Sequence, residues 1–199
     1  MRDVAIKSIV RDLQERGVDL GNMTALDFFA REGDWQTSYY ANLVSKIHAW
    51  EIDPNFEVSL RKNLPSNAEI KIGDSYEHAR ECREKFDLIV LDNPQGCFGR
   101  DYCEHFEAIP VILPLLKDVC ILIFNVKSKP FNYEDKAEWR KKRDDFYGVD
   151  ATELSEEFIH NFYKDYFHEL GYLVEFSFLT KRPQEEGLSA YTAKMTRRN

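Results

Sequence analysis

Acidic side chains lie in or at the end of four apolar runs in this 199-residue chain, where β-strands are predicted. Asp27 lies within the first run, and Glu51, Asp74 and Asp92 come at the ends of the next three. The carboxyl ends of parallel strands meet at one edge of an open α/β sheet, which is where such folds bind ligands. The four carboxylates are therefore predicted to border one site.

The loop after the first run favours a cationic ligand that has no phosphates. A pyrophosphate site needs several glycines, whose backbone N–H groups can approach the anionic oxygens. This loop contains one glycine, Gly33, between Glu32 and Asp34. The two carboxylates would repel a pyrophosphate and tolerate a sulfonium nucleoside, so a dinucleotide dehydrogenase is a poor alternative.

The order Asp27, Phe29-Ala30, Gly33 resembles the first motif of class I S-adenosyl-L-methionine (SAM) methyltransferases, in the D-x-F-A-G-x-G form common among nucleic-acid enzymes. Arg31 stands where that family has its first glycine, and a side chain there could crowd the methionine end of the ligand. The other interpretation of this segment is an ordinary βα turn with Asp27 as a cap.

The resemblance implies SAM as the cofactor and a set of residues around it. In this family, the acid at the end of the second strand, here Glu51, holds the ribose, and Ile52 after it lies against the adenine. The acid after the third strand, Asp74, faces the adenine amino group. The full predicted cofactor set is Asp27, Phe29, Ala30, Gly33, Glu51, Ile52, Asp74 and Ser75. Asp74 is equally placed to cap the following helix, and Glu51, for which the sequence shows no structural role, could be a plain surface glutamate.

The predicted catalytic residues are Asp92, Asn93 and Pro94, which end the buried run Leu88–Leu91. Side-chain and carbonyl acceptors there can bind the N–H groups of an exocyclic amine and turn its lone pair toward a methyl donor. The Asn-Pro pair resembles the start of the [D/N/S]-P-P-aromatic motif of amino-methylating enzymes. Gln95 and Gly96 depart from that motif, so Phe98 is the candidate for stacking on the target. A turn without chemistry is the alternative.

A basic, aromatic segment follows the fifth predicted strand. Residues 127–143 carry a local charge of +4 in a chain of net charge −8, with Phe131, Tyr133 and Trp139 interleaved. Such a segment can bind phosphates and bases, so RNA or unpaired DNA is the predicted partner. The candidate substrate residues here are Lys127, Arg140, Lys141, Lys142 and Arg143. A solvated helix face is the alternative.

The predicted fold is a single α/β domain over residues 1–199, a three-layer sandwich with a mostly parallel, seven-stranded sheet. It begins with an N-terminal helical segment (1–22), carries the basic/aromatic segment as an insertion (127–150), and closes with an antiparallel hairpin of Tyr172–Thr180 and Leu188–Met195. This layout is similar to that of class I methyltransferases. Apolar spacing also predicts a helix extending to Ile47 and another over residues 104–117.

Composition indicates an ordinary globular protein in a reducing, cytoplasmic setting, with no membrane span. The four cysteines are predicted to be free thiols. Cys97, Cys103 and His105 lack paired metal-ligand spacing, so we expect no metal. On the last long helix, Phe158, Phe162, Tyr166 and Leu170 are predicted to face the core.

The sequence predicts a SAM-dependent methyltransferase that methylates a nitrogen on a nucleic-acid base. Two alternatives remain open. One is a methyltransferase that acts on a small molecule, which the acidic net charge permits. The other is a noncatalytic subunit that keeps the fold, suggested by Arg31 and by the missing aromatic of the second motif.

Overall fold

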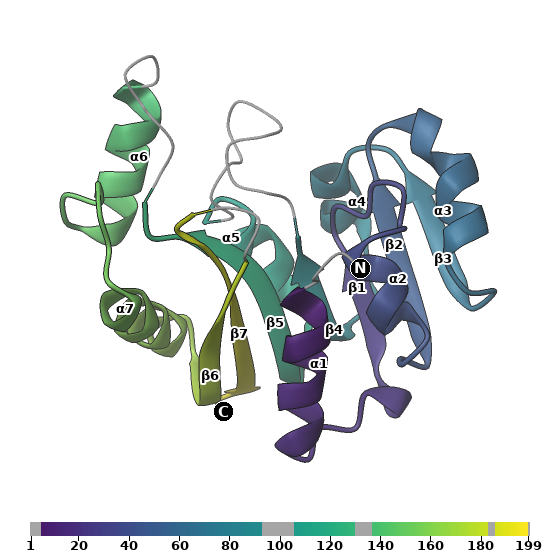
Figure 1. Cartoon of the computed structure of the whole chain (residues 1–199), viewed down its shortest axis with the longest axis horizontal. Helices are drawn as coiled ribbons and strands as arrows, with labels where there is room; N and C mark the ends of the chain where they lie inside the picture. Colours follow the sequence, from purple (N-terminus) through teal and green to yellow (C-terminus); the bar gives the residue numbers. More distant parts are fainter. Residues whose placement is uncertain (1–4, 93–105, 130–136, 183–185, 199) are drawn as a thin grey trace.

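A seven-stranded sheet forms the centre of the molecule, with helices on both sides (Figure 1). The computed structural model describes residues 5–92, 106–129, 137–182 and 186–198. The strands are β1 (Thr24–Asp27), β2 (Lys46–Glu51), β3 (Ala68–Ile72), β4 (Phe86–Leu91), β5 (Leu116–Lys127), β6 (Tyr172–Lys181) and β7 (Leu188–Arg197). Their order across the sheet is β3-β2-β1-β4-β5-β7-β6.

The first five strands are parallel and the last two are antiparallel. β1 pairs with β2 and with β4, β2 with β3, and β4 with β5, all in parallel. β7 lies between β5 and β6 and is antiparallel to both. The predicted mixed sheet with a C-terminal hairpin is confirmed.

Helices cover the two faces of the sheet in separate layers. The helices are α1 (Ala5–Glu15), α2 (Gln36–Ala41), α3 (Glu57–Asn63), α4 (Ser75–Glu81), α5 (Ile109–Ile112), α6 (Ala137–Tyr147) and α7 (Glu156–Glu169), with 3₁₀ turns η1 (Leu20–Asn22), η2 (Pro54–Phe56) and η3 (Leu113–Leu115). α1, α2 and α3 pack on one face, whereas α4, α5 and α7 pack on the other.

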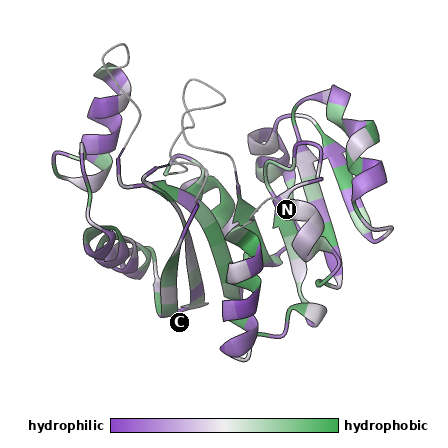
Figure 2. Cartoon of the chain, viewed as in Figure 1, coloured by the Kyte–Doolittle hydropathy of each residue, from purple (hydrophilic) through white to green (hydrophobic). Residues whose placement is uncertain are grey.

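The two apolar cores follow the alternation of side chains along the central strands. In β4, Leu88 and Val90 join the core under α1, while Ile89 and Leu91 join the core under α5 and α7. Strands buried on both faces read as continuous apolar runs, and β4 and β5 are the most hydrophobic ribbons in Figure 2.

Two predicted helices are shorter than expected. The helix expected to reach Ile47 ends at Ala41, and Ile47 is a fully buried residue of β2. In place of a helix over 104–117, the described part contains only α5 and η3, and β5 already begins at Leu116. Pro110 lies in the first turn of α5 and Pro114 in that of η3, where the missing N–H group is tolerated.

The buried stripe of α7 is one residue out of the predicted register. Ile159, Tyr163 and Phe167 are buried, whereas Leu170 is 40% exposed. The predicted stripe is only partly buried because it lies on the flank of the helix, where Phe162 packs against Phe146 and Tyr147 of α6. Two adjacent apolar stripes of α7 have the same four-residue spacing. The stripe of Ile159, Tyr163 and Phe167 is buried, and α6 packs against the neighbouring stripe at Phe162.

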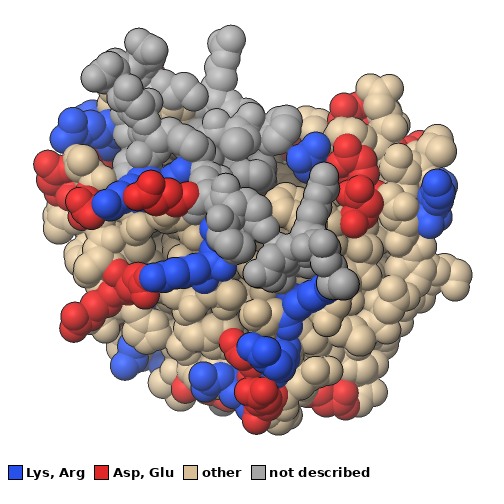
Figure 3. All heavy atoms as spheres, in the orientation of Figure 1, with Lys and Arg blue, Asp and Glu red and all other residues tan. Residues whose placement is uncertain are grey.

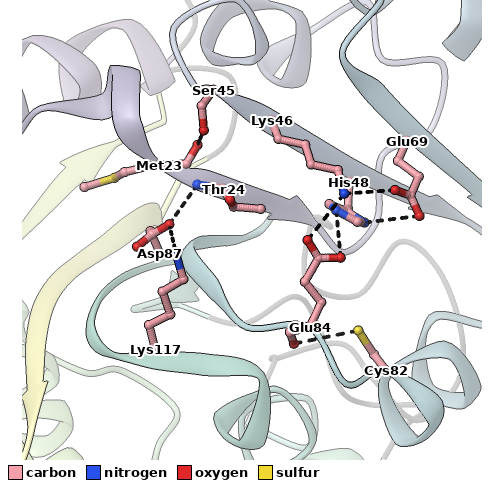
Figure 4. Close-up of polar contacts among 10 residues, drawn as sticks. All are labelled: Met23, Thr24, Ser45, Lys46, His48, Glu69, Cys82, Glu84, Asp87 and Lys117. Atoms are coloured by element: carbon pink, nitrogen blue, oxygen red, sulfur yellow. Dashed lines mark hydrogen bonds and ion pairs between the residues drawn. The ribbon is translucent and has the colours of Figure 1, made fainter.

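The amino ends of the strands are joined by their own polar contacts (Figure 4). Asp87 of β4 accepts hydrogen bonds from the backbone N–H of Thr24 (2.8 Å) and from Lys117 Nζ (2.7 Å). His48 of β2 lies between Glu69 and Glu84, with ring nitrogens 3.8 and 3.2 Å from their carboxylate oxygens. These contacts stabilise this end of the sheet.

Two compositional expectations can be checked on the described residues. Cys82 and Cys120 are free thiols there, as predicted. None of the helices in the described ranges is long and apolar enough to cross a membrane.

Candidate functional site

The order of the sheet reverses between β1 and β4, and two of the predicted acids lie at that point. The chain moves from β1 outward to β2 and β3, then returns to place β4 on the other side of β1. Asp27 is the last residue of β1 and pairs with Val90, two residues before Asp92. Ligands in open α/β sheets bind at such a reversal, beyond the carboxyl ends of the strands.

The loop after β1 has the conformation that a glycine would favour. Arg31 has φ 49°, the only positive φ of a non-glycine residue in the described ranges. Its guanidinium lies over the ring of Phe56 (5.8 Å to the centroid), and its Nε is 3.4 Å from Glu32. The side chain of Arg31, which stands where the methyltransferase motif has its first glycine, therefore packs toward η2.

Glu51 holds this loop, contrary to the expectation that it has no structural role. Its Oε2 accepts a hydrogen bond from the backbone N–H of Arg31 (2.7 Å), and its Oε1 accepts one from that of Asp53 (2.9 Å). The backbone N–H of Ala30 also donates to the carbonyl of Trp50 (2.9 Å). The expectation was wrong because one of the two donors to the carboxylate, the N–H of Arg31, belongs to a loop twenty residues earlier in the chain.

The segment after β3 reaches the same loop. Ser75 Oγ donates to the carbonyl of Phe28 (2.7 Å), and the backbone N–H of Gly73 donates to the carbonyl of Glu51 (2.8 Å). Asp74 caps α4, accepting from the N–H of Tyr76 (2.7 Å), so its structural role is confirmed. The ends of β1, β2 and β3 thus meet, as the sequence predicted.

Ile52 presents an apolar surface beside these contacts. It follows Glu51 at the end of β2, and 66% of its surface is exposed. An exposed isoleucine next to hydrogen-bonded backbone is a suitable support for a flat ring.

Asp27 is buried beneath the loop. Its carboxylate accepts hydrogen bonds from Thr37 Oγ1 (2.6 Å), Tyr40 OH (2.9 Å) and the N–H of Phe29 (3.3 Å). Burial raises the pKa of Asp27 to about 6, and the negative charge of Asp92 adds to the increase, while the hydrogen bonds oppose it. The carboxylate fixes the path from β1 into α2.

Asp92 lies in a network drawn from four distant parts of the chain. Its Oδ2 accepts from Gln36 Nε2 (2.5 Å), and its Oδ1 accepts from Arg182 Nη1 (2.5 Å) and Asn125 Nδ2 (3.4 Å). Burial raises the pKa of Asp92, and Arg182 is the strongest opposing influence. The guanidinium of Arg182 also lies 5.2 Å from the ring centre of Trp35.

Three predicted residues cannot be placed. Asn93, Pro94 and Phe98 lie outside the described residues, as do Cys97, Cys103 and His105. In the described part of the chain, no three His, Cys, Asp or Glu side chains are grouped so as to hold a metal ion.

The predicted basic surface is partly wrong. Lys127 and Arg143 are 3% and 1% exposed, and Arg143 Nη2 donates to the carbonyl of Lys127. The side chains of Arg140, Lys141 and Lys142 are exposed, but Lys141 pairs with Asp145 (2.5 Å).

The other two exposed cations of α6 have acidic neighbours as well. Arg140 lies 3.8 Å from Asp144, and Lys142 Nζ lies 3.0 Å from Glu107. On the face shown in Figure 3, Lys and Arg side chains likewise lie beside Asp and Glu side chains.

Sequence reasoning missed Gln36, Trp35, Asn125 and Arg182. Asn125 left a signal, because it is a polar residue inside the apolar run of β5. Arg182 left none, since it lies 90 residues from Asp92 in the chain.

A cavity of about 460 Å³ lies beside Arg182 at the ends of β5, β6 and β7. Val126, Ile159, Leu179 and Leu188 give it apolar walls, and Lys129 and Lys181 lie at its charged border. The cavity is on the side of the sheet reversal opposite to Glu51.

Comparison with known proteins identifies the fold. No protein-family model matches the chain, and no curated protein matches it in sequence. Among solved structures, the N-methyltransferase NodS from Bradyrhizobium japonicum matches with a TM-score of 0.57 and 13% identity, covering 98% of this chain and 97% of that one.

Two structures from M. jannaschii are also similar. A tRNA methyltransferase matches with a TM-score of 0.56 and 16% identity, over 98% of this chain and 50% of that one, so this chain spans half of its length. TYW2, solved in complex with SAM, has a TM-score of 0.54 and 16% identity, over 95% and 75% of the two chains. The chain has the class I SAM-dependent methyltransferase fold.

Proposed function

We propose that the protein is a SAM-dependent methyltransferase. The observation that carries the proposal is the joining of three strand ends at the sheet reversal, where Glu51 accepts the N–H of Arg31 and Ser75 holds the carbonyl of Phe28. This framework needs neither a glycine-rich loop nor a phosphate, and one structural neighbour was solved with SAM bound.

The residues at this edge fit the cofactor. The Glu51 carboxylate accepts one backbone N–H on each oxygen, which leaves lone pairs for a ribose diol. The exposed Ile52 can support the adenine, and Asp74 and Ser75 border it on the β3 side. Asp27, Phe29, Ala30 and Gly33 shape the loop on the β1 side. SAM, when bound, supplies an electrophilic methyl group.

The acceptor is proposed to be a nitrogen, oriented from the end of β4. Asp92 and the adjoining Asn93 and Pro94 offer carboxylate, amide and carbonyl oxygens in succession. Such acceptors bind the N–H groups of an amine and turn its lone pair toward the donor. The demand for a general base is low when the proton leaves late.

Calorimetry with SAM tests the cofactor assignment. The wild-type chain should bind SAM, and Ile52→Asp should bind it more weakly, because a carboxylate would replace the apolar support for the ring. Val58→Asp is the matched control, since Val58 is another exposed apolar residue (78%), located on α3. Heat equal to buffer dilution for the wild type, or equal weakening by both variants, would contradict the assignment.

We further propose a nucleic-acid substrate, RNA or single-stranded DNA. The basic segment and the similarity to a tRNA methyltransferase support it. Replacing Arg140, Lys141 and Lys142 by Gln should weaken binding to single-stranded RNA and flatten the dependence of log K on log salt by about 2, at 0.7 per neutralised phosphate. Phe98 and the buried Lys127 and Arg143 are not changed in this test.

A control triple variant makes the test specific. Arg11, Lys62 and Lys164 are exposed cations on α1, α3 and α7, and their replacement by Gln removes the same charge. Equal RNA affinity in the two triple variants would contradict the nucleic-acid proposal.

The acidic partners of the α6 cations favour a second candidate, methylation of a small molecule. The chain would then transfer methyl groups to a metabolite extract from which nucleic acid has been removed. Radiolabelled SAM with this extract, compared with purified RNA, separates the two candidates.

A further inference from the structure

Arg182 joins the C-terminal hairpin to the end of β4. It follows β6 directly, and its backbone N–H donates to the carbonyl of Leu188 (2.9 Å), which fixes its position on the hairpin. The whole residue is 4% exposed. Its Nη1 donates to Asp92 (2.5 Å) and to Asn125 Oδ1 (2.8 Å). The guanidinium is therefore held at one place between β4, β5 and β6.

We propose that Arg182 is the positioning residue of the methyl-acceptor site, which it serves by holding the Asp92 carboxylate in one orientation. This inference rests on the proposed methyltransferase function. Arg182 acts through Asp92 and also forms part of the wall of the 460 Å³ cavity beside it.

The hydrogen bonds to Asp92 leave little freedom. A carboxylate has about four lone-pair sites. Arg182 and Asn125 donate to Oδ1, and Gln36 donates to Oδ2. The side chain of Asp92 is 16% exposed. Because Oδ1 already accepts two hydrogen bonds and Oδ2 only one, the free lone pair of Oδ2 is the one that a ligand can use.

The same contacts extend to α1 and to the start of α2, on one face of the sheet. Gln36 Oε1 accepts from the backbone N–H of Ile6 (3.1 Å), which connects α1 to the network. The indole of Trp35 covers the guanidinium of Arg182 at 5.2 Å. Each donor to Asp92 is thus itself fixed by a neighbour, as a preorganised site requires.

A stabilising role alone does not account for this arrangement. A buried ion pair can often be replaced by apolar side chains of similar volume without loss of stability. The pair lies at the carboxyl end of β4, beside the sheet reversal, and the cavity adjoins Arg182. Its position predicts an effect on turnover that differs from its effect on folding.

The experiment compares Arg182→Met, Arg182→Lys, Asp92→Asn and the double variant that combines Arg182→Met with Asp92→Asn. Each variant is assayed for SAM binding by calorimetry, thermal unfolding, and methyl transfer to RNA, single-stranded DNA and a nucleic-acid-free metabolite extract. Arg61→Met is the matched control. It changes an exposed arginine of α3 that also pairs with a carboxylate, that of Glu57 (2.7 Å), away from the proposed acceptor site.

Arg182→Met should lower kcat by about 100-fold, the order expected when a reacting group is misplaced by about 1 Å. It should leave SAM affinity unchanged and shift the acidic limb of the pH–rate profile upward, since Asp92 loses its cation while Asp27 stays nearby. Arg182→Lys should restore part of kcat. Arg61→Met should behave as the wild type does.

Three results would overturn the inference. The first is wild-type kcat and pH profile in a folded Arg182→Met variant. The second is a loss of kcat in Arg182→Lys as large as in Arg182→Met. The third applies if Arg182→Met fails to fold. In that case the inference is overturned if the double variant folds and if both the double variant and Asp92→Asn have the kcat of the wild type. Absence of SAM binding and transfer in the wild-type chain would instead refute the proposed function itself.

Discussion

The buried Asp27 carboxylate makes the stability of the protein depend on pH in a specific way. The side chain is 1% exposed, and burial raises its pKa from 3.8 to about 6. A raised pKa means that the folded protein keeps the proton over a pH range in which the unfolded chain has already released it. The contribution is fully favourable below pH 3.8, is lost as the pH rises through about 6, and then stays constant.

The size of the effect follows from the two pKa values. A shift of one unit corresponds to about 1.4 kcal/mol, so ionisation of Asp27 lowers the free energy of unfolding by about 3 kcal/mol at pH 7.5. At pH 4.5 the unfolded carboxyl is mostly ionised and the loss is only about 1 kcal/mol. Asp27→Asn, which cannot ionise, should therefore gain about 2 kcal/mol relative to the wild type between pH 4.5 and 7.5.

Urea denaturation at several pH values measures this difference directly. The prediction concerns its slope with pH, because the amide also alters the hydrogen bonds with Thr37 and Tyr40 and adds a constant term. Asp165→Asn, at an exposed position of α7, is the control and should show no such slope. A pH-independent difference between Asp27→Asn and the wild type would refute the reasoning.

Changes at Glu51, Arg31 and His48 test other contacts. Glu51→Gln leaves one backbone N–H, of Arg31 or Asp53, without its acceptor and should cost about 1–3 kcal/mol by urea denaturation, with weaker SAM binding; unchanged values would show that these bonds do not hold the loop. Arg31→Gly should change stability by no more than about 1 kcal/mol, because φ is already 49°, and Arg31→Val should cost more; equal effects would contradict a strained backbone. Burial lowers the pKa of His48 below 6.5 against the opposing influence of Glu84, so the contribution of His48 to stability should fall as the pH falls from 6.5 toward 5, and the stability of the wild type relative to His48→Gln should decrease over that range; parallel curves would refute this.

The sequence could predict the strand ends of the site because the signals there are local. An apolar run followed at once by a carboxylate marks the end of a buried strand, and this held at Glu51 and Asp92. Asp27 lies inside its apolar run, and β1 ends there, three residues before Ala30. Helix caps are equally local, which is why Asp74 has the predicted structural role. The pairing of strands then follows from the few topologies that parallel βα units allow.

The partners of polar side chains could not be predicted, because they lie far away in sequence. Charge counting marked Lys127 and Arg143 as basic, but no local signal shows that both would be buried in the fold. The acids that pair with the α6 cations include Glu107, 35 residues before Lys142. Net charge over a segment therefore overstated the charge available to a phosphate backbone.

The network around Asp92 explains why the C-terminal hairpin matters to the site. β7 enters the sheet between β5 and β6, so Asn125 of β5 and Arg182 after β6 come to lie at the edge where β4 ends. The proposed cofactor half of the site, around Glu51, is built from β1 to β3 and does not use the hairpin. We therefore expect changes in the hairpin to alter the orientation of the acceptor while the loop that is proposed to bind SAM remains intact, and this division is why the affinity for SAM and the rate of transfer must be measured separately.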